Sequence, residues 1–246
     1  MTGGASGIGL ATVTRLVDDG WTVVAADRDA DALAALPDDP QIIAAQIDVT
    51  DERQVDDVAA RANRLAEGLD AVVTCAGIVR NAAAVDATVD DVRGTLDVNV
   101  VGTLLACRAA ARHMLARDRG GALVTISSVS GLRGGRDRAA YAASKAAVIA
   151  LTKVLAVELG PAGIRANCVA PGATETPLVA VAQPPRVRRA VLASIPLGRY
   201  ARPAETAAVI AFLAGPESGF VTGQTWGVDG GQTAGPGWHL SDQEEQ

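Results

Sequence analysis

Short apolar runs alternate with longer segments of helical periodicity along the whole chain. The runs are rich in valine, isoleucine and alanine, and they predict buried strands at residues 21–26, 41–47, 69–74, 122–126, 165–169 and 224–228. Apolar positions at helical spacing predict helices at residues 7–19, 89–117 and 141–159, and from about 203 onward. Apolar strands separated by helices are typical of a parallel sheet covered on both faces. The pattern therefore predicts an α/β fold with one doubly wound parallel sheet of the Rossmann type.

The alternation continues without a linker or an internal repeat, which predicts a single domain over residues 1–246. Chains of this length commonly form one large α/β unit. Residues 233–246 contain GPG followed by SDQEEQ, and we expect this tail to be partly mobile.

Composition and charge narrow the function classes. Hydrophobic residues make up 49% of the chain and charged residues 20%, which excludes a disordered protein. The formal net charge of −6 offers no basic surface, so we expect no nucleic-acid partner. No apolar stretch of about 18 residues and no signal peptide is evident, so we expect a cytoplasmic protein without a membrane partner. The cysteines and histidines lack the spacing of a metal site, and no metal is expected: Cys75, Cys107, Cys168, His113 and His239.

The chain opens with MTGGASGIG, in which Gly3, Gly7 and Gly9 precede a helical pattern. Glycines permit a tight turn and a close backbone approach to a pyrophosphate, whose charge then lies at a helix N-terminus. The spacing is TGxxxGxG rather than the common GxGxxG. Taken alone, the motif also fits a glycine-rich helix start without a ligand.

Two acidic residues end the next two predicted strands. Asp27 ends WTVVAAD, where a carboxylate can accept hydrogen bonds from the adenosine ribose hydroxyls and repel a 2′-phosphate. Arg28 follows and could offset that repulsion, but the strand-end position of Asp27 favours NAD over NADP. Asp48 is placed to reach the adenine, with Val49 against the ring. Thr50 is the expected N-cap of the helix that follows, and the alternative role of Asp48 is to cap that same helix.

The segment SSVSGLRGGRDRAAYAASK carries the chain's most specific chemistry. Tyr141 and Lys145 lie four residues apart, so on a helix their side chains share one face. A neighbouring ammonium favours the phenolate of a tyrosine, as a general base for an alcohol requires. Ser128 ends an apolar run, where an α/β sheet presents its ligand site, and its hydroxyl can hold the substrate oxygen. Ser127 alternates to the other side of the strand and is expected to be structural.

From Thr2 to about Gly231 the chain resembles the short-chain dehydrogenase/reductase family. TGGASGIG is similar to the family's cofactor loop, and Asn99 in LDVNVVGT to the asparagine of its proton relay. The family's NNAG appears here as TCAG, which lacks the asparagine side chain; Cys75 is expected to be structural. NCVAPGATET is similar to the segment facing the nicotinamide, and Val169 is expected near its carboxamide. The motifs and the resemblance together predict these cofactor-binding residues: Gly3, Ser6, Gly7, Ile8, Gly9, Asp27, Asp48, Val49, Ala76, Gly77, Tyr141, Lys145, Pro171, Gly172, Thr174 and Thr176.

The resemblance implies hydride transfer between NAD and a small secondary alcohol or ketone. Tyr141 would be the general acid/base and Ser128 would position the substrate oxygen. Lys145 would bind the nicotinamide ribose, and Asn99 would help to hold a water that links Lys145 to solvent. The resemblance also implies a homotetramer. Substrate, stereochemistry and physiological direction are not determined by these motifs.

Three alternative functions can each be weighed against a feature of the sequence. A 3-oxoacyl-(carrier protein) reductase would use NADPH, against which Asp27 argues. A non-catalytic NAD-sensing protein could dispense with the catalytic set, yet all four residues are present. A sugar-nucleotide epimerase shares the Tyr-x3-Lys spacing but needs a larger substrate region than the roughly 100 residues after Lys145.

Residues 178–199 are expected to form a lid over the substrate. Arginines on this lid and on the loop after Ser128 could bind an anionic substrate; the alternative is a solvated lid face. These arginines are Arg133, Arg136, Arg186, Arg188 and Arg189.

The start of the chain raises a separate hypothesis. Thr2 stands where the last residue of a central strand is expected, so the first central strand is expected to be missing or truncated. Losing it would leave unpaired strand edges inside a buried sheet, at about 1–3 kcal/mol for each unpaired group. We therefore hypothesise that Met1 is a mis-assigned start, as a GTG valine codon read as an initiator would produce.

Overall fold

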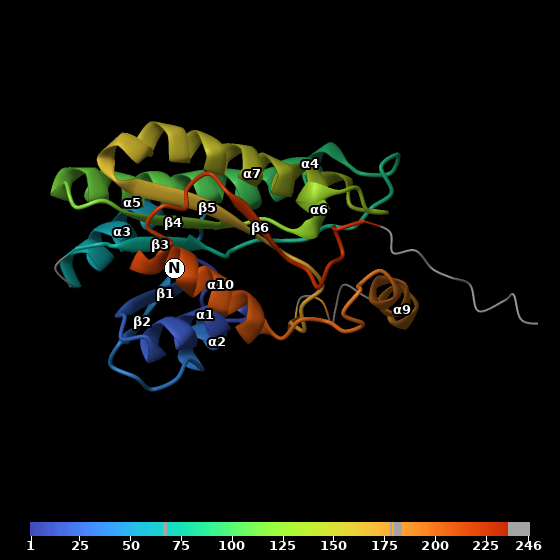
Figure 1. The fold of residues 1–246 in the computed structure, drawn as a ribbon, viewed down its shortest axis with the longest axis horizontal. Coiled ribbons are helices and arrows are strands. Elements are labelled where there is room, and N and C mark those ends of the chain that lie inside the picture. The colour runs from blue at the N-terminus through green and yellow to red at the C-terminus, as the bar shows by residue number, and fades with distance from the viewer. Residues whose placement is uncertain (66–67, 178, 180–183, 236–246) are drawn as a thin grey trace, which may run out of the picture.

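The computed structural model describes residues 1–65, 68–177, 179 and 184–235. Within these residues the fold is built on six parallel strands. The strands are β1 (Val23–Asp27), β2 (Ile42–Gln46), β3 (Ala71–Thr74), β4 (Gly121–Ile126), β5 (Ile164–Pro171) and β6 (Thr225–Val228). They pair in the orders β1-β2 and β3-β4-β5-β6. The predicted α/β fold with a parallel sheet and flanking helices is confirmed (Figure 1).

The two parts of the sheet meet at Met1 and Thr2. Thr2 forms isolated parallel bridges to Ala26 and Thr74. Its N–H donates to the Val73 carbonyl at 3.0 Å, and its carbonyl accepts from the Cys75 N–H at 3.0 Å. Met1 pairs with β1 as well, since its amine donates to the Val24 carbonyl at 2.7 Å and its carbonyl accepts from the Ala26 N–H at 2.8 Å. Residues 1–2 thus lie between β1 and β3, at the central position that the sequence predicts.

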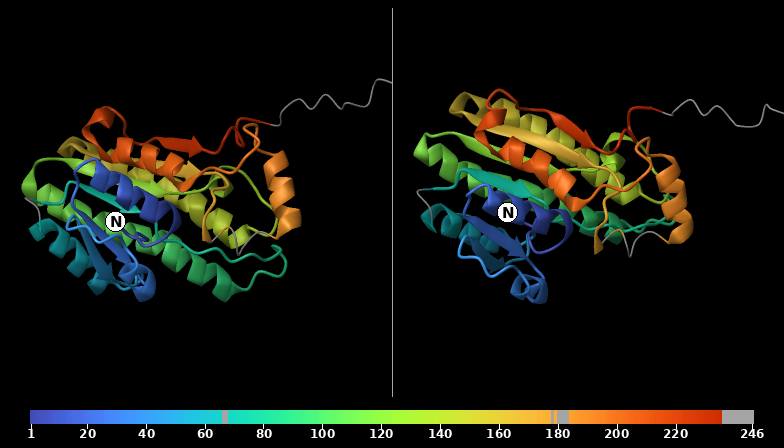
Figure 2. Two further views of the ribbon diagram at one scale, coloured as in Figure 1. Left: turned by 90° about the horizontal axis from the view of Figure 1, so that it is seen from below. Right: turned by 60° about the horizontal axis from the view of Figure 1, so that its bottom comes forward.

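Helices cover both faces of the sheet. α1 (Gly7–Asp18) and α10 (Pro203–Ala214) pack together on one face (Figures 1 and 2). The other face carries α3 (Glu52–Leu65), α4 (Val89–Leu96), α5 (Gly102–Arg117) and α7 (Ala139–Leu159). Shorter helices are α2 (Ala30–Ala34), α6 (Val129–Leu132) and α9 (Pro185–Ala193), with 3-10 turns at Gly160–Ala162 and Pro216–Ser218.

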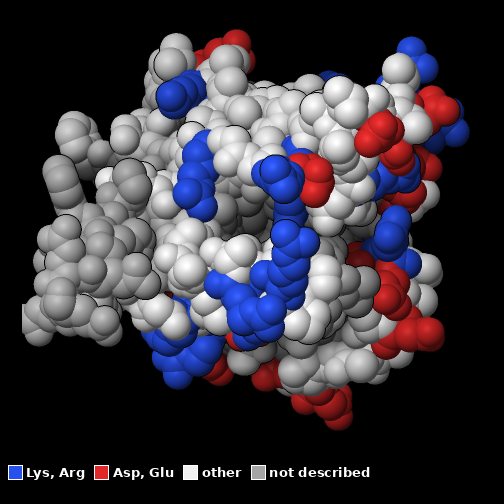
Figure 3. Space-filling view, turned by 90° about the vertical axis from the view of Figure 1, so that its right-hand side faces the viewer, with Lys and Arg blue, Asp and Glu red and all other residues white. Residues whose placement is uncertain are grey.

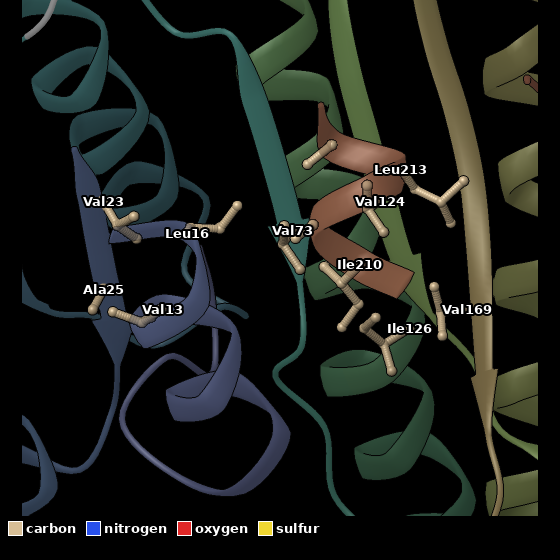
Figure 4. Packing of buried hydrophobic residues seen from close by; sticks show 12 residues of the cluster. Val13, Leu16, Val23, Ala25, Val73, Val124, Ile126, Val169, Ile210 and Leu213 are labelled. Atoms are coloured by element: carbon tan, nitrogen blue, oxygen red, sulfur yellow. The ribbon is translucent and has the colours of Figure 1, made fainter. Parts of the chain in front are cut away.

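A buried cluster holds α1 and α10 against the sheet (Figure 4). Val13 and Leu16 come from α1, Ile210 and Leu213 from α10, and Val124 from the sheet. Each fully buried aliphatic side chain of this size contributes roughly 1.5–3 kcal/mol of transfer free energy. This packing fixes α1, and with it the glycine-rich turn at its N-terminus.

Two predictions of local structure are corrected. The helix expected at residues 89–117 is interrupted by a π-helical turn at Asp97–Val101, because the Asn99 side chain is buried and hydrogen-bonds outside its own helix. Thr50 does not cap α3. The Asp51 carboxylate accepts from the N–H groups of Arg53 and Gln54 at 2.9 and 3.2 Å instead.

One helix has the length and hydropathy of a membrane span, so the expectation that no such segment exists is wrong. α7 with the following turn, residues 139–162, is long and apolar enough, and 39% of its most apolar window is buried. In the fold it packs on β5, and its Ser127 and Thr125 neighbours hydrogen-bond to Lys145 and Thr152. Core helices of other proteins share this composition. Residues 236–246 of the expected tail lie outside the described residues. Residues 178 and 180–183 of the expected lid also lie outside them.

Candidate functional site

A cleft of about 470 Å³ lies at the carboxyl ends of β1, β3, β4 and β5. Cofactor and small-molecule sites are typically roughly 300–1,000 Å³. Among the predicted catalytic residues, Ser128, Tyr141 and Lys145 line the cleft and Asn99 does not. Every predicted cofactor residue lines it: Gly3, Ser6, Gly7, Ile8, Gly9, Asp27, Asp48, Val49, Ala76, Gly77, Tyr141, Lys145, Pro171, Gly172, Thr174 and Thr176.

The glycine-rich turn brings the N-terminus of α1 to the cleft. Ser6 precedes the helix in an extended conformation, and its side chain makes no capping hydrogen bond. Gly3 has φ +66°, and a Cβ there would lie 2.5 Å from the Ala76 nitrogen. Gly7 has φ +53°, and its Cβ would lie 3.2 Å from Thr176 Cγ2. The turn therefore tolerates no larger side chains, and the uncapped helix end fits a bound pyrophosphate.

Asp27 is held at the end of β1 by two backbone groups. Its Oδ2 accepts from the Ala5 N–H at 3.1 Å, and its Oδ1 accepts from the Asp29 N–H at 3.2 Å. Each carboxylate oxygen keeps a further acceptor site, so the group can also accept from ribose hydroxyls. Arg28 lines the cleft beside it.

Asp48 accepts from the Thr50 N–H at 2.9 Å and from the Thr50 hydroxyl at 2.7 Å. These hydrogen bonds hold the pKa of Asp48 below its usual range. Asp48 thus organises the turn before α3, and it does not bond to the N–H groups of the helix itself. This differs from the alternative role as a helix cap.

Tyr141 and Lys145 project from α7 into the cleft. The Lys145 side chain is 4% exposed, and its Nζ donates to the Ile126 carbonyl at 2.9 Å and lies 5.8 Å from the centre of the Tyr141 ring. Ser128 follows β4, and its Oγ accepts from the Ser130 N–H at 3.1 Å, which leaves the hydroxyl proton free for a ligand. Ser127 also lines the cleft, but its hydroxyl donates to the Lys145 carbonyl at 2.8 Å, which agrees with the structural role that the sequence predicts.

Asn99 lies behind the cleft wall and is fully buried. Its side chain bonds to both backbone groups of Ile78, and its Nδ2 donates to the Ser144 hydroxyl at 2.9 Å. A Cβ at Gly77 would lie 3.1 Å from Asn99 Oδ1 and 3.3 Å from Lys145 Nζ. Asn99 therefore adjoins Lys145 through the space that Gly77 leaves.

Two further expectations concern Cys75 and Val169. Burial raises the pKa of the Cys75 thiol to about 11, which agrees with a structural rather than nucleophilic cysteine. Val169 is fully buried within β5, and its carbonyl accepts from the Ser127 N–H at 2.7 Å. Val169 is not among the residues that line the cleft, and its expected hydrogen bond to the carboxamide region stays a prediction.

Arg188, one of the arginines that could bind an anionic substrate, is paired with a carboxylate of its own chain, and its role toward a substrate stays a prediction. Both of its terminal nitrogens bind the Glu175 carboxylate, and its guanidinium carbon lies 4.1 Å from the centre of the Tyr200 ring. Arg186 and Arg189 are exposed on the same helix, α9. Glu175 lies thirteen residues away from Arg188, so no local spacing could have signalled this pair.

Arg138 was not among the predicted site residues. Its guanidinium carbon lies 5.6 Å from the centre of the Tyr141 ring. Its position three residues before Tyr141, one helical turn away, was the available signal. Within the described part of the chain, no group of three or more His, Cys, Asp or Glu side chains could hold a metal ion.

Comparisons with known proteins agree with this geometry. The family model described as enoyl-(acyl carrier protein) reductase matches residues 3–233. The chain is 39% identical to the 3-oxoacyl-(acyl-carrier-protein) reductase of Thermotoga maritima, over 94% of this chain and 95% of that protein. It is 41% identical to the cis-4-hydroxycyclohexanecarboxylate dehydrogenase of Sinomonas cyclohexanicum, with 95% of each covered. A crystal structure of a short-chain type dehydrogenase/reductase from Mycobacterium marinum superposes with a TM-score of 0.90 at 34% identity, covering 96% of this chain and 94% of that one.

Proposed function

Since the chain belongs to the short-chain dehydrogenase/reductase family and is an oxidoreductase acting on hydroxyl and ketone groups, we propose that it uses NAD to interconvert a small secondary alcohol and its ketone. One observation carries this proposal: Ser128, Tyr141 and Lys145 share the cleft with the glycine-rich turn and Asp27. Catalytic groups and nucleotide-binding groups thereby face one space.

The proposed roles follow from the contacts of each side chain. The nicotinamide, when bound, takes up or supplies the hydride. Ser128 donates its free hydroxyl proton to the substrate oxygen, and Tyr141 takes a proton from that oxygen during oxidation or returns it during reduction. Lys145 supplies positive charge beside Tyr141 and donates to a ribose hydroxyl. Asn99 is a positioning residue that orders the backbone beside Lys145.

The proposed preference for NAD rests on Asp27. A carboxylate held at the end of β1 is oriented to accept from ribose hydroxyls, and the same negative charge repels a 2′-phosphate. The glycines of the cofactor turn contribute backbone N–H groups and close packing rather than charge.

A second candidate is a 3-oxoacyl-(carrier protein) reductase that uses NADPH. The similarity to the Thermotoga maritima enzyme supports it, as does Arg28 beside Asp27. The two candidates make opposite predictions about cofactor and substrate.

The test is a panel of secondary alcohols and 3-hydroxyacyl thioesters, each assayed with NAD and with NADP and, in the reverse direction, with both reduced cofactors. Turnover of small alcohols with NAD supports the first candidate, and NADPH-dependent reduction of acyl thioesters supports the second. Binding of NAD without turnover of any panel member would favour the NAD-sensing alternative.

We further propose a homotetramer in the cytoplasm. Exposed apolar side chains on neighbouring helices support association, namely Val101 at the end of the π-helical turn, Leu104 and Leu115 on α5, and Val154 and Val157 on α7. The three free cysteines are typical of a reducing compartment. Light scattering on the purified chain, compared with a Val154→Glu, Val157→Glu double variant, tests the assembly.

A further inference from the structure

One arginine beside Tyr141 lacks a partner of opposite charge. Arg138 is half-buried, and its guanidinium lies over the Tyr141 ring. Among the described residues no carboxylate forms an ion pair with it, whereas Arg80, Arg188 and Arg199 each have one. A guanidinium withdrawn from water without a counter-ion is stabilised by an anionic ligand, and its planar fork matches a carboxylate in two-point geometry.

The backbone fixes where this guanidinium lies. Arg138 immediately precedes α7, and its carbonyl accepts from the Ala142 N–H at 2.7 Å. The neighbouring Asp137 has φ +60°, and its carbonyl accepts from the Ala82 N–H at 3.1 Å. The Arg138 side chain passes over Gly135, where an added Cβ would lie 3.4 Å from Arg138 Cγ. Arg138 is therefore held between α7 and the Ala82 segment, beside the tyrosine.

The charges around Arg138 are mostly of the same sign. Lys145 approaches the Tyr141 ring as well, with its Nζ 5.8 Å from the ring centre. Arg133 and Arg136 are exposed on the loop that leads to Arg138, and Asp137 forms no ion pair among the described residues. Figure 3 shows basic side chains gathered round a hollow on the face of the molecule that carries α9. In a chain with a net charge of −6, this local excess attracts an anion to one place.

We propose that Arg138 binds a carboxylate of the substrate, so that the substrate class is a small hydroxy acid and the corresponding oxo acid. This inference rests on the proposed function. The guanidinium lies over the ring whose hydroxyl exchanges a proton with the substrate, so the anion it binds belongs to a group close to the reacting carbon. The phosphates of an acyl thioester carrier lie at the far end of a pantetheine arm, and that distance favours a carboxylate.

The experiment compares a charged alcohol with its neutral counterpart: 4-hydroxycyclohexanecarboxylate and 4-hydroxycyclohexanecarboxamide, with NAD. We expect Arg138→Gln to raise KM for the carboxylate about 10-fold or more and to change KM for the amide less than about 2-fold. Arg138→Lys should restore part of the affinity. Arg119→Gln, an exposed change at a residue that does not line the cleft, is the matched control and should alter KM for neither substrate.

A second measurement does not depend on turnover. Cyclohexanecarboxylate should raise the melting temperature of the NAD-saturated wild-type chain more than cyclohexanecarboxamide does, and Arg138→Gln should remove the difference. Equal effects of Arg138→Gln on acid and amide would overturn the proposal. The proposal would also be overturned if the only charge selectivity observed were a preference for 3-hydroxybutyryl-CoA over the corresponding N-acetylcysteamine thioester, which lacks phosphates. Charge-selective binding without turnover of any alcohol would instead refute the proposed function, and with it the substrate class, and would leave Arg138 only as a carboxylate-binding residue.

Discussion

The side chain of Asn99 clamps the backbone of Ile78 at two points: Oδ1 accepts from the Ile78 N–H at 2.8 Å, and Nδ2 donates to the Ile78 carbonyl at 3.0 Å. The clamp joins the π-helical turn at Asp97–Val101 to the segment that follows β3. Gly77, Ile78 and Lys145 meet beside it. The position of the cleft wall next to Lys145 therefore depends on one buried amide.

Asn99→Ala should lower both stability and turnover. It leaves two partly buried backbone groups of Ile78 without their protein partners, at a cost of up to about 1–3 kcal/mol each. We expect a fall in melting temperature together with a drop of about 10-fold or more in kcat, measured below the transition of the variant. Asn167 makes the same two-point contact away from the cleft, to the Val221 carbonyl and the Gln224 N–H, at 2.7 and 3.1 Å. Asn167→Ala is thus the matched control, and an equal loss of kcat there would assign the Asn99 effect to stability alone.

The chain's two lysines both lie on α7, which permits a direct comparison. Lys145→Met should reduce turnover by about 100-fold or more, because it removes the positive charge beside Tyr141. Lys153→Met changes an exposed residue of the same helix and should leave turnover unchanged. Steady-state rates with NAD and the preferred alcohol measure both. Comparable rates for the two variants would contradict the proposed role of Lys145.

Tyr141→Phe should abolish most turnover and leave NAD binding near normal. The substitution removes the hydroxyl that exchanges the proton and keeps the ring beside Arg138. Calorimetry gives the NAD affinity, and steady-state kinetics give the rate, expected to fall by at least about 100-fold. Unchanged turnover in Tyr141→Phe would contradict the proposed mechanism.

Asp27→Asn should shift the cofactor preference toward NADP. The amide keeps the shape of the side chain but removes the negative charge that repels a 2′-phosphate and accepts from ribose hydroxyls. We expect the ratio of kcat/KM for NAD to that for NADP to fall about 10-fold or more. Asp31→Asn is the control, since Asp31 is exposed and does not line the cleft. A ratio that stays constant in Asp27→Asn would place the cofactor preference elsewhere.

Because of Glu205, the melting temperature should depend on pH in the acid range. The Arg199 guanidinium, followed by the Arg202 N–H, lowers the pKa of Glu205 from 4.5 to about 2. A carboxyl group whose pKa is lower in the folded state stabilises the fold above its unfolded pKa, and this contribution is lost as pH falls from about 4.5 toward 2. We expect Glu205→Gln to lower the melting temperature at pH 7 and to flatten its decline between pH 5 and pH 2. Glu217→Gln, on the exposed turn after α10, should do neither.

The pattern of apolar runs by itself determined the strands and their parallel arrangement, because a run that is apolar on both faces must be covered on both. The cofactor turn and the Tyr141–Lys145 pair were also determined locally, since helical spacing sets which side chains share a face. Parallel strands end at one edge of the sheet, so Asp27, Ser128 and Pro171 could be assigned to one cleft before their contacts were known.

Tertiary structure alone decided the contacts made across long sequence distances. The π-helical turn at Asn99 follows from a hydrogen bond to Ile78, 21 residues earlier, which outweighs local helix propensity. Arg188 is paired with Glu175, whereas Arg138, beside Tyr141, forms no ion pair within the described part of the chain. An arginine in a sequence has the same charge in every fold. Whether that charge is neutralised by a carboxylate or left for a ligand depends on which side chains the fold places within reach. For this reason the residue proposed to bind an anion is Arg138 rather than Arg188.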